Sequence, residues 1–251
     1  MLSASLQHPQ LTNLFCLDPF AAKHLARFSR RVNSLPLADP VDIDRELKID
    51  ATQLKTQLGI EPQRKVLLLF GALTKRKGIL PLLDALCLLS PEITNRLCLF
   101  LVGSMDSEFK DRIASKIDRL TSSTSVQVVT QYEYVSETEI QQYFQLADVV
   151  LALYQRHVGM SGILIRAAAA QKPVLASNYG LMGEITRRYK LGIDLDAKDP
   201  QAIAKGLTEF LSHSPMTFAD AHLMEQFATQ NSAVNFASTI FQTLNIAPVV
   251  N

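Results

Sequence analysis

The sequence lacks any strong imbalance of charge. Its 251 residues include 25 lysines and arginines and 24 aspartates and glutamates, which gives a formal net charge of +1. Proteins that bind nucleic acid or anionic membranes through bulk electrostatics carry a marked excess of positive charge. The balance therefore gives no electrostatic sign of an anionic membrane surface as a partner, and we expect no nucleic acid.

Cysteines and long apolar runs are also scarce. The three cysteines, Cys16, Cys87 and Cys98, form no CxxC pair, and their odd number argues against a disulfide framework or a zinc site. The N-terminus has no apolar run of signal-peptide length, and apolar runs elsewhere, such as residues 66–70, are too short to span a membrane. We therefore expect a reduced, cytoplasmic setting and no transmembrane segment.

Short, continuous apolar runs alternate with helical patterns from residue 65 onward. Strands are expected at 66–70, 97–102, 126–129, 149–153, 174–176 and, more weakly, 192–195. Runs that are apolar throughout, rather than at alternate positions, indicate strands buried on both faces of a parallel sheet. Ser136 and Glu139 have the spacing of a capping box at the start of one intervening helix. The pattern predicts an α/β fold with a doubly wound, Rossmann-like parallel sheet.

The two ends of the chain follow other patterns. Near the N-terminus we expect a strand end at 14–17, one helix at 20–32 and a proline-punctuated crossing at 35–41. One strand and one helix cannot bury a core alone. Near the C-terminus the pattern predicts helices at 199–212, 219–228 and 232–244. We therefore divide the chain into a remnant of another domain with its crossing (1–40), the Rossmann-like domain (41–212) and C-terminal helices that pack back on both (213–251).

The segment 157–177 contains the clearest candidate for a binding site. A tight turn with Gly159, Ser161 and Gly162 follows an apolar strand and opens a helix of small residues. Such a turn presents unpaired backbone N–H groups and the positive end of the helix dipole, which favour an anion such as phosphate. The same turn also suits a helix that merely packs closely on a strand. Neither GxGxxG nor GxxxxGK[ST] occurs, so the dinucleotide fingerprint and the P-loop are excluded.

Several blocks of the chain match one family in order and spacing. They are residues 71–78, Gly103, residues 147–148, the SG-to-KPV block at 161–174, residues 180–184 and residues 191–192. Together they resemble the C-terminal, donor-binding domain of GT-B glycosyltransferases of the group 1 type, over about residues 34–211. The resemblance implies a nucleotide-sugar donor, UDP- or GDP-linked, bound at the strand ends. It also implies transfer of a hexosyl group with retention of configuration, with no metal and no further cofactor.

The resemblance assigns roles to particular residues. Lys77, in the loop from Gly71 to Gly78, falls on the lysine that contacts the donor phosphate, whereas that lysine's arginine partner falls on Ala72. Ser161 and Gly162 fall where backbone amides meet the diphosphate. We expect His157 and Gly159, beside them, as further contacts to sugar or phosphate.

Two carboxylates of the family are replaced in this chain. The paired glutamates, which contact the donor sugar and the ribose hydroxyls in the family, fall on Val158 and Arg166. Valine cannot accept a hydrogen bond and arginine can only donate one, so neither can replace a carboxylate. Arg166 can instead reach a phosphate, which a guanidinium binds well. The sequence therefore assigns no catalytic residue.

About forty residues precede the crossing, and they resemble the last strand and helix of the family's acceptor domain. We expect that domain to be supplied by a partner chain or a second copy, with exposed apolar surface near residues 1–40. The leading interpretation is the donor-binding half of a retaining glycosyltransferase. The alternative is a catalytically degenerate nucleotide-sugar-binding or scaffold module. A response-regulator-like or flavodoxin-like domain is a weaker third, since neither an acidic phosphorylation pocket nor a flavin loop is visible.

Overall fold

The computed structural model describes residues 6–28, 31–42, 44 and 46–244. Its main domain contains a six-stranded sheet in the order β5-β4-β3-β6-β7-β8, and every neighbouring pair is parallel. The strands are β3 (Lys65–Phe70), β4 (Leu97–Val102), β5 (Gln127–Gln131), β6 (Val149–Ala152), β7 (Val174–Ser177) and β8 (Gly192–Leu195). All six expected strands are present, which confirms the parallel α/β fold.

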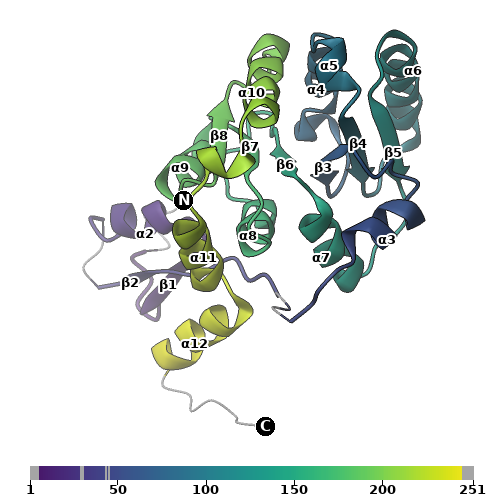
Figure 1. Cartoon of the computed structure of the whole chain (residues 1–251). Helices are drawn as coiled ribbons and strands as arrows, with labels where there is room; N and C mark the ends of the chain where they lie inside the picture. The colour runs from purple at the N-terminus through teal and green to yellow at the C-terminus, as the bar shows by residue number, and fades with distance from the viewer. Residues whose placement is uncertain (1–5, 29–30, 43, 45, 245–251) are drawn as a thin grey trace.

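Helices cover both faces of this sheet (Figure 1). One face carries α4 (Ile79–Leu86), α6 (Ser107–Ser123) and α10 (Pro200–Ser212); the other carries α7 (Glu137–Leu146), α8 (Gly162–Ala169), α9 (Gly180–Arg188) and α11 (Ala221–Gln230). Short helices α3 (Ala51–Gln57) and α5 (Pro91–Thr94) complete the layers. Along β3, Leu67 joins the cluster around α4 and Leu68 joins the cluster around α7. Successive side chains of a strand point to opposite faces, which explains why the run is apolar throughout.

Two local features set the ends of these elements. At the start of α7, Ser136 Oγ accepts from Glu139 N at 3.3 Å and Glu139 Oε2 accepts from Ser136 N at 2.9 Å, so the capping box is confirmed. At the start of β6, Asp148 accepts from Val66 N at 2.8 Å and from Lys65 Nζ at 2.9 Å. Asp148 therefore joins the amino ends of β6 and β3.

The N-terminal unit differs from the expectation. It has two strands, β1 (Asn13–Cys16) and β2 (Asn33–Pro36), which pair in parallel. Helix α2 (Pro19–Leu25) connects them in the sequence. The helix expected over 20–32 was therefore too long, and the crossing begins as a strand. Phe28 N already bonds to the carbonyl three residues back, at Leu25, so the helix has given way to a tighter turn. A separate small apolar cluster, including Leu6, Cys16 and Leu25, holds this unit together.

The C-terminal helices are present where the sequence predicts them. Helix α11 packs on α8, and its Met224, Phe227 and Ala228 belong to the core of the sheet domain. Helix α12 (Ala233–Thr243) follows it and lies beyond α11 in Figure 1. In the part of the chain that the structure describes, no helix is long and apolar enough to cross a membrane.

Candidate functional site

The strand order creates one place where a ligand is expected. From β3 the chain proceeds to β4 and β5 on one side, and then crosses to β6 on the other side of β3. In parallel sheets a crevice opens beyond the carboxyl ends of the strands at such a switch point, and ligands bind there. By this rule the loops after β3 and β6, which contain most of the expected site residues, border the place where a ligand is expected.

The backbones of the two loops are in close contact. Gly78 has φ +71°, and a Cβ on it would lie 2.3 Å from the carbonyl oxygen of Leu153. Gln155 N donates to Arg76 O at 2.7 Å, which joins the loops a second time. Only glycine adopts this backbone conformation without strain and leaves room for Leu153. Gly78 therefore permits the close approach of the two loops.

Lys77 is buried between the ends of β3 and β6, with 5% of its surface exposed. Its Nζ donates to Phe70 O at 2.8 Å and to Tyr154 Oη at 2.6 Å, and lies 4.4 Å from the centre of the Tyr154 ring. An ammonium group has three N–H donors, so one remains for a ligand. Burial, together with the nearby charge of Arg76, lowers the pKa of Lys77 to about 7. An anion in the crevice would favour the charged form.

Gly71 lies beside the Lys77 ammonium and has no side chain to crowd it. A Cβ at Gly71, where φ is +104°, would lie 3.0 Å from Lys77 Nζ. Any larger residue would thus crowd the Lys77 ammonium. The expected pair of Gly71 and Lys77 is brought together by the structure.

Tyr154 connects Lys77 to the turn that opens α8. Its Oη lies 2.7 Å from Ser161 Oγ, and burial raises the pKa of its phenol. A charged lysine can only donate, so Tyr154 Oη accepts from Lys77 and gives its own proton to Ser161. Ser161 Oγ also accepts from Ile163 N at 3.4 Å. The Ser161 hydroxyl proton then needs an acceptor from outside this chain of bonds, and an anion is such an acceptor.

The helix end adds backbone donors to the same place. Ser161 is the N-cap of α8 and Gly162 is its first residue, and both are half-buried. The first amides of a helix have no partner within the helix, and the dipole adds positive potential there. Ser161, Gly162 and Lys77, which are separated in sequence, are thus linked at the switch point through Tyr154.

His157 and Gly159 lie on the turn itself. The His157 ring stacks on Tyr154 with centroids 5.0 Å apart, and its Nε2 donates to Met160 O at 3.1 Å. A Cβ at Gly159 would contact the His157 ring at 3.5 Å. The β7 side supports the turn, because Leu181 N donates to Val158 O at 3.1 Å. Both residues therefore lie beside Tyr154, and their contact with a donor stays a prediction.

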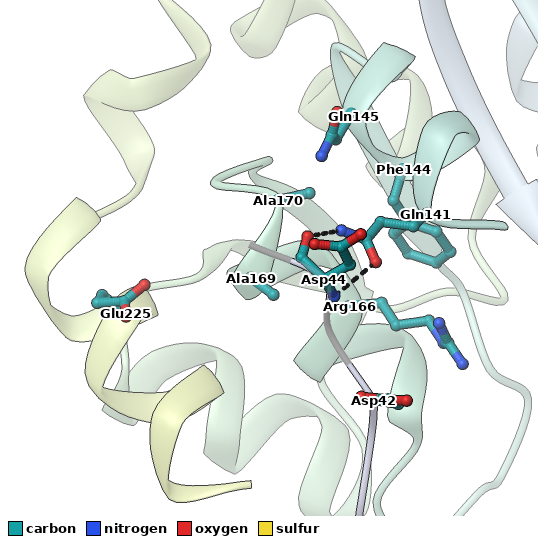
Figure 2. A pocket seen from close by; sticks show the side chains of 9 residues that line it. All are labelled: Asp42, Asp44, Gln141, Phe144, Gln145, Arg166, Ala169, Ala170 and Glu225. Carbon is teal, nitrogen blue, oxygen red and sulfur yellow. Dashed lines mark hydrogen bonds between the residues drawn. The ribbon is translucent and has the colours of Figure 1, made fainter. Parts of the chain in front are cut away.

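Arg166 has a different setting. It donates from Nη2 to Glu137 Oε2 at 2.8 Å and lines a cavity of about 250 Å³ between α7, α8 and α11. Figure 2 shows that the lining also includes the carboxylates Asp42, Asp44 and Glu225. The charge of Arg166 is thus balanced by a carboxylate, and its expected contact with phosphate stays a prediction.

One residue of the site was missed by the sequence analysis. Tyr154 follows the apolar run of β6, and nothing in its local pattern separates it from a core tyrosine. Its signal was its position directly after the strand at the switch point. Among the residues that the structure describes, no three His, Cys, Asp or Glu side chains come close enough to hold a metal ion.

Comparisons with known proteins place the chain in a family. The family model of the group 1 glycosyl transferases matches residues 50–229. An uncharacterised glycosyltransferase of Methanocaldococcus jannaschii is 26% identical over 174 residues, which cover 68% of this chain and 41% of that protein. The D-inositol 3-phosphate glycosyltransferase of Corynebacterium urealyticum is 29% identical over 112 residues, covering 45% of this chain and 26% of that protein. The chain thus spans less than half the length of these curated relatives.

Solved structures share the fold. HepE of Anabaena, in complex with UDP and glucose, superposes with a TM-score of 0.75 at 19% identity, over 93% of this chain and 63% of HepE. Sucrose-phosphate synthase of Thermosynechococcus elongatus superposes with a TM-score of 0.74 at 20% identity, over 97% of this chain and 60% of that one. Because the family model matches more than half of its residues, the chain belongs to the group 1 glycosyltransferases.

Proposed function

We propose that this chain is the donor-binding part of a glycosyltransferase and that its β3–β6 crevice holds the diphosphate of a UDP- or GDP-linked sugar. The observation that carries the proposal is the chain of hydrogen bonds from Lys77 through Tyr154 to Ser161 at the switch point. This chain of bonds leaves one N–H of Lys77 and the hydroxyl proton of Ser161 as donors, and an anion is a suitable acceptor for both. That HepE was solved with UDP and glucose supports the same ligand class.

Each residue of the crevice has a distinct part in this proposal. Lys77 supplies positive charge, and Gly71 leaves the space beside it. Ser161 and the amide of Gly162 donate to the diphosphate oxygens from the start of α8. His157 and Gly159 border the sugar side of the turn. Arg166 is a more distant phosphate contact whose charge Glu137 offsets.

The proposed reaction is hexosyl transfer with retention of configuration, with the acceptor domain supplied by a partner chain or a second copy. Leu17 and Phe28 of the N-terminal unit are 55% and 66% exposed, as expected for a surface that pairs with such a domain. The sheet domain provides the donor site, and the partner provides the acceptor.

A second candidate is nucleotide-sugar binding without transfer. It is favoured by Val158, which stands where the family has a glutamate and is 69% exposed beside the turn. An exposed valine there can neither accept a hydrogen bond from the sugar nor stabilise developing positive charge. The two candidates share a ligand and differ only in turnover.

Isothermal titration with UDP-glucose and GDP-mannose tests the shared part. We expect saturable binding of one of them, weakened at least about tenfold in Lys77→Ala, because a charge-assisted hydrogen bond is lost. Lys75→Ala is the matched control, since Lys75 is an exposed lysine in the same turn and should change affinity little. If neither ligand binds, or if both variants bind alike, the donor-site proposal fails.

Release of UDP or GDP from the bound sugar nucleotide separates the two candidates. Turnover that disappears in Lys77→Ala supports transfer. Tight binding with no release, even after addition of a candidate partner domain, supports the binding module.

A further inference from the structure

A second cavity lies away from the switch-point loops, between the N-terminal unit and the C-terminal helices. It has a volume of about 430 Å³ and is lined by residues of α2, α9, α11 and α12. Figure 1 shows these helices grouped at one end of the molecule, on the α9 side of the sheet. The volume is within the range of small-molecule sites. We name it the α2–α9 cavity.

The charged side chains that line the α2–α9 cavity are all positive among the described residues. Lys23 of α2 and Arg188 of α9 line it, and no aspartate or glutamate does so among the described residues. Neither cation forms an ion pair with any described residue. Two unpaired cations from different elements therefore border one hollow, an arrangement suited to a phosphate group. Arg187, the neighbour of Arg188, is instead paired with Glu184 and Asp194.

The rest of the lining suits a polyhydroxylated body. Gln230, Asn231 and Asn235 contribute side-chain amides, which are both donors and acceptors. Gln230 Oε1 accepts from Tyr189 Oη at 2.9 Å, which leaves the Gln230 amino group for a ligand. Asn231 Nδ2 donates to the backbone at 2.8 Å, which leaves its Oδ1 as an acceptor. Neutral groups of both kinds complement sugar hydroxyls.

Aromatic rings form the apolar part of the wall. The Arg188 Cζ lies 5.4 Å from the Phe20 ring centroid, so the guanidinium is held over an aromatic face. Tyr189 and Phe227 pack with ring centroids 4.7 Å apart on the same cavity. Such rings offer an apolar surface to the C–H face of a sugar ring, with polar groups at the edges.

We propose that the α2–α9 cavity binds a sugar phosphate of hexose size, with Arg188 and Lys23 on the phosphate and the side-chain amides of Gln230, Asn231 and Asn235 on the hydroxyls. The inference concerns binding alone and does not depend on the donor proposal. Met160, which precedes Ser161, lines the cavity, so the two sites adjoin. A sugar phosphate bound there lies next to the turn that opens α8.

Titration calorimetry with glucose 6-phosphate and fructose 6-phosphate tests whether the α2–α9 cavity binds a sugar phosphate. We expect saturable binding of at least one, weakened by at least about tenfold in the double variant Lys23→Gln/Arg188→Gln, which loses both charged contacts. Arg187→Gln is the matched control and should bind like the unmodified protein. Lys77→Ala should also leave this binding unchanged, which separates the cavity from the donor site.

Three results would overturn the proposal. The first is the absence of saturable binding of either sugar phosphate. The second is unchanged affinity in the double variant, provided that circular dichroism shows it folded; both side chains are exposed, so folding should survive. The third is binding of inorganic phosphate as strong as that of the sugar phosphate, since the amides would then have no ligand to recognise.

Discussion

Binding of a nucleotide sugar should weaken as the pH rises from 6 to 8, because Lys77 loses its proton in this range. Burial of the ammonium, with Arg76 nearby, lowers its pKa to about 7 in the free protein. A bound diphosphate favours the charged lysine, and so only the protonated fraction of the protein binds well. Affinity is therefore expected to be nearly full at pH 6 and to fall as the pH rises through 7.

The magnitude follows from that protonated fraction. With a pKa of about 7, the fraction falls about tenfold between pH 6 and pH 8, which corresponds to about 1.4 kcal/mol of binding free energy. UDP-glucose is the right ligand for the measurement, because its diphosphate lacks the terminal phosphate proton of UDP, which titrates near this range. Calorimetry at several pH values, in buffers of equal ionic strength, gives the affinity directly.

Two variants test whether the pH dependence of binding comes from Lys77. Lys77→Arg keeps its charge at every pH in the range, so its affinity should be independent of pH. His157→Gln removes the nearby imidazole and should keep the tenfold change. Equal affinity of the unmodified protein at pH 6 and pH 8, or a slope that persists in Lys77→Arg, would refute this reasoning.

Three further predictions concern the fold and the charges beside the crevice. Gly78→Ala should lower the free energy of unfolding in urea by about 3 kcal/mol. Gly59→Ala is the control: Gly59 has a similar φ of +68°, but a Cβ there would meet no atom within 4 Å, so the loss should be only about 1 kcal/mol. Equal losses in the two variants would contradict the close approach of Gly78 to Leu153. Asp148→Ala should cost about 2 kcal/mol, because it leaves a buried strand amide unpaired, without changing UDP-glucose affinity. Glu137→Gln should strengthen UDP-glucose binding by about threefold, because it frees the charge of Arg166; weaker binding would indicate that Glu137 contacts the ligand.

The sequence predicted the sheet domain well because its signals are local. Each central strand is a continuous apolar run, and such runs are typical of a parallel sheet that helices cover on both faces. The capping box at Ser136 is likewise complete within four residues. Strand β2 was missed because residues 33–36 have no apolar pattern and pair with β1 mainly through the backbone.

The site was less predictable because its contacts join distant parts of the chain. The hydrogen bond from Lys77 to Tyr154 spans 77 positions, and the ion pair of Arg166 with Glu137 spans 29. A sequence pattern shows that a lysine and a small-residue turn follow two neighbouring strands. Whether a tyrosine connects them, or a carboxylate neutralises an arginine, depends on how the loops pack in space.

A crystal structure of the protein with UDP-glucose tests the central claim most directly. The account predicts the diphosphate in the β3–β6 crevice, with its oxygens within hydrogen-bond distance of Lys77 Nζ, Ser161 Oγ and the Gly162 amide. UDP-glucose bound elsewhere, such as in the α2–α9 cavity, or a diphosphate that leaves Lys77 and Ser161 bonded only to Tyr154, would contradict it.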